Sequence, residues 1–92
     1  MQEREIIKIV KDHEGNIIAL RNQYMGWSPV SVNEVIQHIE SDLYSYYVNL
    51  PNLGKVSLCV EQINQKKILR TDPSKAAKNL LGDLPIYVIY DD

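Results

Sequence analysis

Residues 31–43 read SVNEVIQHIESDL, and they decide the fold class because they join a helix start signal to a helical apolar stripe. Ser31 and Glu34 have the spacing of a capping box, in which the Ser hydroxyl accepts from a backbone N–H and the Glu carboxylate reaches back. The apolar residues at helical spacing behind this box are Val32, Val35, Ile36, Ile39 and Leu43. The sequence therefore predicts a helix over residues 32–43, packed by this stripe against a sheet.

The segment before the helix predicts a β-hairpin. Residues 5–12 (EIIKIVKD) are rich in β-branched side chains and indicate a strand, and residues 16–23 (NIIALRNQ) indicate a returning strand. Gly15 lies in the intervening turn and suits a backbone with positive φ. Alternation leaves both faces of this hairpin apolar, so we expect other elements to cover each face.

The segment after the helix predicts further strands and a second, shorter helix. Residues 55–63 and 66–70 indicate two strands, whereas residues 44–54 combine aromatic residues with chain breakers and are left unassigned. Asp72 as N-cap, with proline next, predicts a helix over residues 74–81. Residues 86–90 (IYVIY) fit an added strand, a cover for the second face of the sheet or part of a subunit interface.

Length and composition indicate one domain over residues 1–92. The 45% hydrophobic content supports a single core rather than disorder. We predict an α+β fold: a small antiparallel sheet of about four strands, with one main helix packed on one face and a short C-terminal helix.

The charge of the chain argues neither for nor against a nucleic-acid partner. The net charge is −2, and the balance runs −3, +4 and −3 over residues 1–54, 55–82 and 83–92.

No apolar stretch is long enough to span a membrane. Cys59 is the only cysteine and lies in an apolar run, which excludes an internal disulfide and predicts a buried thiol. These features, with a polar start of the chain, predict a cytoplasmic protein.

Several segments resemble one protein family. They are Leu69-Arg70-Thr71-Asp72-Pro73, Asn79-Leu80 and Leu84-Pro85, with Gly15-Asn16-Ile17, Gly26, Ser31 and Glu34 in the earlier part. This pattern is similar to the bacterial family catalogued as domain of unknown function (DUF) 3892. The present chain differs from the family pattern by a longer segment around residues 45–53. The resemblance implies a compact bacterial domain and no particular activity.

Catalytic and metal-binding patterns are weak. His13 falls in a turn and His38 in the helix, and neither has a Cys, Asp or Glu at recognisable ligand spacing. Nucleophile elbows, P-loops and dinucleotide fingerprints are missing. Arg70 and Asp72 fit either a binding or acid–base pair, or a helix cap beside a structural arginine. Asn79 is expected to form hydrogen bonds with backbone groups of its loop. We therefore expect a non-catalytic protein without metal or cofactor.

Two sets of residues are candidates for binding. Tyr24, Met25 and Trp27 lie in a connection, where they suit a protein interface or self-association; alternatively, Trp27 folds back onto the core. The second set consists of Lys66, Lys67, Arg70, Lys75 and Lys78. If these residues form one patch they would suit phosphates of a nucleic acid, and otherwise they are a solvated face. A protein partner or a homodimer is the leading prediction.

Overall fold

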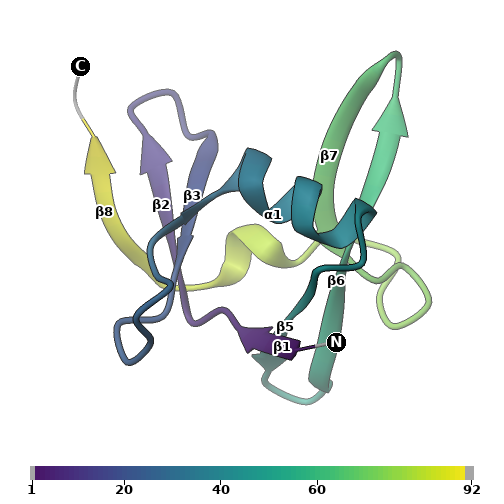
Figure 1. The fold of residues 1–92 in the computed structure, drawn as a ribbon, viewed down its shortest axis with the longest axis horizontal. Helices are drawn as coiled ribbons and strands as arrows, with labels where there is room; N and C mark the ends of the chain where they lie inside the picture. Colours follow the sequence, from purple (N-terminus) through teal and green to yellow (C-terminus); the bar gives the residue numbers. More distant parts are fainter. Residues whose placement is uncertain (1, 91–92) are drawn as a thin grey trace.

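Two small sheets and one helix make up the fold. The computed structural model describes residues 2–90, and side chains over residues 2–86. In chain order the elements are β1 (Gln2–Glu5), β2 (Lys8–Asp12), β3 (Ile17–Arg21), β4 (Val30–Ser31), α1 (Val32–Glu40), β5 (Tyr44–Leu50), β6 (Gly54–Ile63), β7 (Lys66–Thr71), the 3-10 helix η1 (Leu81–Asp83) and β8 (Ile86–Tyr90). The strand orders are β1-β5-β6-β7 and β4-β3-β2-β8. Figure 1 shows the two sheets on either side of α1.

The predicted α+β class with one main helix is confirmed, but the strands form two four-stranded sheets instead of one. Nor are the sheets wholly antiparallel, because β1 runs parallel to β5 and β8 runs parallel to β2. The segment that sequence left unassigned forms β5, which pairs with both β1 and β6. Residues 86–90 are the added strand among the three alternatives.

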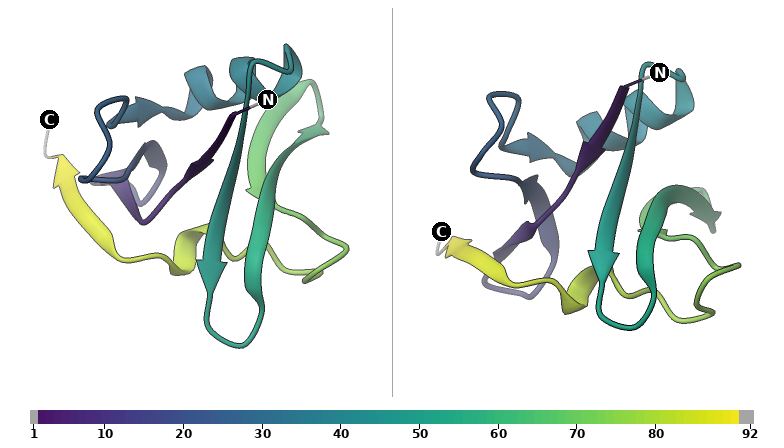
Figure 2. Two further views of the ribbon diagram at one scale, coloured as in Figure 1. Left: turned by 60° about the horizontal axis from the view of Figure 1, so that its bottom comes forward. Right: turned by 90° about the horizontal axis from the view of Figure 1, so that it is seen from below.

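The chain crosses from one sheet to the other near its start. The N–H of Ile6 donates to the carbonyl of Tyr47 in β5 (2.8 Å), and the N–H of Ile7 donates to the carbonyl of Arg21 in β3 (3.0 Å). This change of partner divides the predicted strand over residues 5–12 into β1 and β2. One continuous segment, residues 2–12, thus gives a strand to each sheet, and Figure 2 shows it in purple between them.

The capping box predicted for α1 is confirmed. The N–H of Glu34 donates to Ser31 Oγ (3.1 Å), and Glu34 Oε1 accepts from the N–H of Ser31 (3.2 Å). The helix ends at Glu40, earlier than predicted, because Asp42 turns the backbone to a φ of 58°. Val35 and Ile36 are buried, and α1 contacts strands of both sheets.

One hydrophobic cluster fills the space between the sheets and α1. Its fully buried members include Ile9 and Leu20 from one sheet, Val48 and Val56 from the other, and Val35 from the helix. Val10 of the first hairpin is also buried, but Ile18 is 37% exposed, so the cover predicted for both faces of this hairpin is incomplete. The cluster gives the two sheets a common core.

The loop after β7 replaces the helix predicted over residues 74–81. Asp72 does begin a turn, because its carbonyl accepts from the N–H of Ala76 (3.3 Å). Beyond this turn, side chains take over the backbone groups: Arg70 Nη2 donates to the carbonyl of Ala77 (2.8 Å). A helix needs its own N–H groups at these carbonyls, so helical structure is confined to the three residues of η1.

Candidate functional site

The connection between β3 and β4, residues 22–29, is held in one shape by a buried asparagine; we call it the Asn22 loop. Asn22 is 5% exposed. Its Nδ2 donates to the carbonyl of Glu5 (3.0 Å), and its Oδ1 accepts from the N–H of Tyr24 (3.1 Å). The N–H of Asn22 donates to Ser28 Oγ (2.9 Å), and the N–H of Met25 donates to the carbonyl of Asn22 (3.0 Å). The loop backbone is therefore fixed by hydrogen bonds within the loop and to the end of β1.

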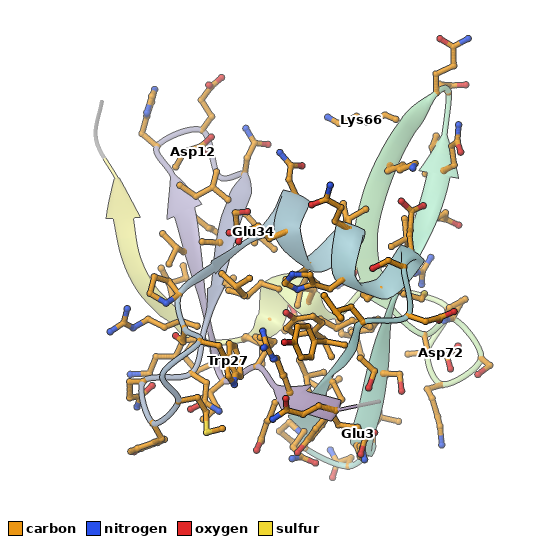
Figure 3. All side chains as sticks on the ribbon, viewed as in Figure 1. Glu3, Asp12, Trp27, Glu34, Lys66 and Asp72 are labelled. Carbon is orange, nitrogen blue, oxygen red and sulfur yellow. The ribbon has the colours of Figure 1, made fainter. Side chains whose placement is uncertain are left out.

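The three interface candidates of this loop lie on two sides of it. Tyr24 is 78% exposed and Met25 is 42% exposed. Trp27 is partly buried and packs against the core, with its ring centroid 6.1 Å from that of Tyr46 in an edge-on arrangement. The labelled Trp27 in Figure 3 lies on the side of its loop that faces the centre of the molecule. Trp27 thus anchors the loop, while Tyr24 and Met25 form its outer surface.

Trp27 belongs to a group of side chains that we call the aromatic cluster: Arg4, Trp27, His38, Tyr44 and Tyr46. The hydroxyl of Tyr46 accepts from Arg4 Nη1 (3.1 Å) and lies 2.7 Å from His38 Nδ1. The Arg4 guanidinium lies 3.5 Å from the ring centroid of Tyr44 and 5.0 Å from that of Trp27. Burial raises the pKa of the Tyr46 hydroxyl. This arrangement is a set of cation–π and hydrogen-bond contacts, and it supports the loop from below.

Sequence reasoning missed the aromatic cluster, because its members come from β1, α1, β5 and the Asn22 loop. Arg4 and Tyr46 are 42 positions apart in the chain, so no local spacing relates them. The one available signal was alternation in β5, which places Tyr44 and Tyr46 on the same face of that strand.

The basic candidates do not gather into one patch. Lys66 begins β7 and the loop with Lys75 and Lys78 follows its end, and Figure 3 shows the labelled Lys66 and Asp72 at opposite ends of this strand. Lys67 Nζ forms an ion pair with Glu40 (2.8 Å).

Arg70 donates hydrogen bonds to backbone carbonyls where the chain turns after β7; we call residues 70–81 the corner. Its side chain is 12% exposed and its Nη1 lies 3.6 Å from Glu61 Oε1. Arg70 Nε donates to the carbonyl of Thr71 (2.9 Å), and Nη2 donates to that of Ala77 (2.8 Å). These bonds leave little of the guanidinium for a phosphate.

Asp72 and Asn79 also bond to backbone in this corner. Asp72 Oδ1 accepts from the N–H of Ser74 (2.9 Å), and this bond lowers the pKa of the Asp72 carboxyl. Asn79 Oδ1 accepts from the N–H groups of Thr71 (3.2 Å) and Leu81 (3.1 Å). Asp72 therefore closes a turn and does not cap the predicted helix, which is missing, whereas Asn79 bonds to loop backbone groups as predicted.

A model built for proteins of unknown function, DUF3892, matches residues 5–85. The chain belongs to the DUF3892 family. The match runs from the end of β1 to the residue before β8, so it contains the Asn22 loop, α1 and the corner after β7. No curated protein and no solved structure matches the chain.

Five of the residues on which the DUF3892 resemblance rests have structural roles here. Ser31 and Glu34 form the capping box of α1, and Arg70, Asp72 and Asn79 bind backbone groups around the corner. Local chain geometry accounts for these residues without a ligand.

Two further observations on this DUF3892 domain concern metal-ligating side chains and the cysteine. Over the described residues, no three His, Cys, Asp or Glu side chains are grouped so that they could hold a metal ion. Cys59 is partly buried, and burial raises the pKa of its thiol, which disfavours the reactive thiolate. No helix in the described part of the chain has the length and apolar character needed to cross a bilayer.

Proposed function

We propose that this chain is a non-catalytic binding domain of a bacterial cytoplasm, which contacts a protein partner or a second copy of itself through the Asn22 loop. The observation that carries the proposal is the exposure of Tyr24 and Met25 (78% and 42%) on a loop whose backbone is fixed. Tyrosine supplies a large contact area with a polar tip, and methionine adapts to irregular partner surfaces.

Asn22 and the aromatic cluster hold the Asn22 loop in place, which lowers the free-energy cost of binding a partner. Association costs free energy when loops and side chains must be ordered, so a loop that is already ordered loses less of its contact energy. Asn22 orders the backbone from within, and Trp27 anchors it on the aromatic cluster. A backbone ordered in this way supports the proposal, because less free energy would be lost when Tyr24 contacts a partner.

The alternative function, binding of nucleic acid through the segment from Lys66 to Lys78, has less support. Phosphate contacts add up when cations lie along one surface. Here Arg70 is committed to backbone carbonyls and Lys67 to Glu40, and Lys66 lies far from the loop that carries Lys75.

Cytoplasmic location rests on the thiol and on the family. The single cysteine, Cys59, cannot form a disulfide within the chain, and buried free cysteines are usual in a reducing compartment. The bacterial origin follows from the resemblance to a bacterial family.

The test of the proposed function is loss of complex formation in a Tyr24→Ser, Met25→Ser double variant. Leu43→Ser is the matched control, because Leu43 is a comparably exposed apolar residue (55%) outside the loop. Sedimentation velocity over a range of concentrations detects self-association, and affinity capture with the purified chain as bait detects other partners. We expect the double variant to weaken the complex by about tenfold or more, as hot-spot residues do, and the control to leave it unchanged.

The result that overturns the proposal is equally specific. Equal complex formation by the wild type and the double variant would exclude the Asn22 loop as the contact surface. Absence of any complex with the wild type in both assays would exclude the binding function. The melting temperature should be the same in all three proteins, because the replaced side chains are exposed.

A further inference from the structure

A groove of 430 Å³ opens between the start of β3 and the edge of β7, remote from the Asn22 loop. Four consecutive residues of β7, Lys66–Leu69, line one wall, and the consecutive residues Gly15–Ile17 line the other. Side chains of a strand alternate between its two faces. A lining of consecutive residues therefore means that the edge of β7, with its backbone groups, borders the groove.

The outer edge of β7 carries backbone groups that do not bond to β6. The N–H of Asp72, just after β7, donates to the carbonyl of Ser57 in β6 (2.9 Å). Backbone groups of successive residues point to opposite sides of an antiparallel strand. Thr71, Leu69 and Lys67 therefore direct their N–H and carbonyl groups away from β6, toward the open edge.

One side-chain amide already occupies part of this edge. Asn79 Oδ1 accepts from the N–H of Thr71 (3.2 Å), and Asn79 Nδ2 lies at 3.5 Å from the carbonyl of Leu69. A peptide unit of a neighbouring strand would make this same pair of bonds. Farther along the edge, no hydrogen bond within the described residues reaches the outward groups of Lys67 or the N–H of Leu69.

The side chains around the groove define the chemistry of a ligand. Ile17, Val32 and Leu81 give it an apolar floor. Lys66 is exposed at its rim and has no ion-pair partner among the described residues, whereas Lys67 Nζ is paired with Glu40 (2.8 Å). A ligand that fits these features has apolar side chains on one face and a carboxylate near Lys66.

We propose that the β7 groove binds an extended peptide segment, with alternating apolar and acidic residues, as a strand added to the edge of β7. Main-chain hydrogen bonds to Lys67 and Leu69 would give affinity, and the apolar floor and Lys66 would give specificity. This site is separate from the Asn22 loop, because the two lie at opposite ends of β3.

The open edge is tested first without a ligand, by amide hydrogen exchange of the full chain. The N–H of Thr71 is bonded to Asn79 and should exchange slowly, whereas the N–H groups of Lys67 and Leu69 should exchange faster. The peptide Glu-Val-Glu-Val-Glu-Val-Glu, labelled with fluorescein, is then titrated by fluorescence polarisation and by ¹⁵N NMR. Binding should shift and protect the amides of Lys67 and Leu69.

Matched variants and peptides separate strand addition from simple charge attraction. Lys66→Glu should weaken binding by about tenfold, and Lys75→Glu, which changes net charge equally outside the groove, should not. The same peptide with every backbone nitrogen methylated should not bind, because it cannot donate hydrogen bonds to the carbonyls of β7. Equal binding of the N-methylated peptide, unshifted Lys67 and Leu69 amides, or no binding at millimolar peptide would each overturn the proposal.

Discussion

At the scale of single residues, side chains in this domain take over hydrogen bonds that regular structure would otherwise supply. At the edge of β7, Asn79 accepts a hydrogen bond that a neighbouring strand would otherwise accept. In the loop that follows, Arg70 donates to a carbonyl that a helical N–H would otherwise reach. Thr71 is fully buried, so water cannot accept a hydrogen bond from its N–H. Substitutions at Asn79 should therefore affect stability although the residue itself is exposed.

Asn79→Ala should lower the free energy of unfolding by about 1–3 kcal/mol, because it leaves the N–H of the buried Thr71 without an acceptor. Asn79→Asp keeps an acceptor at the same place and should cost less. Urea denaturation of the three proteins measures both effects. Equal stability of the Ala variant and the wild type would show that water satisfies this N–H.

Tyr46 makes stability depend on alkaline pH. Burial raises the pKa of its hydroxyl in the folded state above the usual value of about 10. The folded chain then holds a proton that the unfolded chain releases, so this contribution is complete below pH 10 and is lost as pH rises through the folded pKa. We expect the free energy of unfolding of the wild type to fall more steeply above pH 10 than that of Tyr46→Phe. Parallel profiles in urea titrations would contradict this.

At the scale of elements, prediction succeeded where the partners are close in sequence. The capping box of α1 joins residues three apart, and the strands β3, β6 and β7 follow local alternation, so sequence sufficed for all of them. The helix predicted over residues 74–81 is wrong although Asp72 begins a turn there, because Arg70 and Asn79 bind backbone groups that the helix would use. Both residues are close in sequence, but helix start signals do not show where their side chains bond.

The turn of the β6–β7 hairpin offers a stabilising substitution. Asn64 and Gln65 both have positive φ, 49° and 68°, as a type I′ turn requires. A side chain at positive φ costs roughly 1 kcal/mol, which glycine avoids. Gln65→Gly should therefore raise the melting temperature by about 4–8 °C, the shift expected of 1 kcal/mol in a domain of this size. A lower melting temperature in differential scanning calorimetry would contradict the assigned turn.

At the scale of the whole molecule, two sheets share one core, and this was beyond the sequence. The crossing between Ile6 and Ile7 has no marker in a run of β-branched residues. The candidate surface was found only in part for the same reason: Tyr24 and Met25 were identified, whereas the aromatic cluster that supports them assembles from distant segments.

Because the two sheets share one core, a destabilising substitution in one sheet should also lower the stability of the other. Ile9 in β2 is fully buried, and Ile9→Val should lower the free energy of unfolding by about 0.5–1.5 kcal/mol. If residues 1–92 form a single cooperative domain, amides of β6 in the opposite sheet that exchange by global unfolding should lose protection by the same free energy. Ile63→Val, at a residue 45% exposed, should leave that protection unchanged. Unaltered protection of β6 in Ile9→Val would mean that the sheets unfold independently, and that the common core does not couple them.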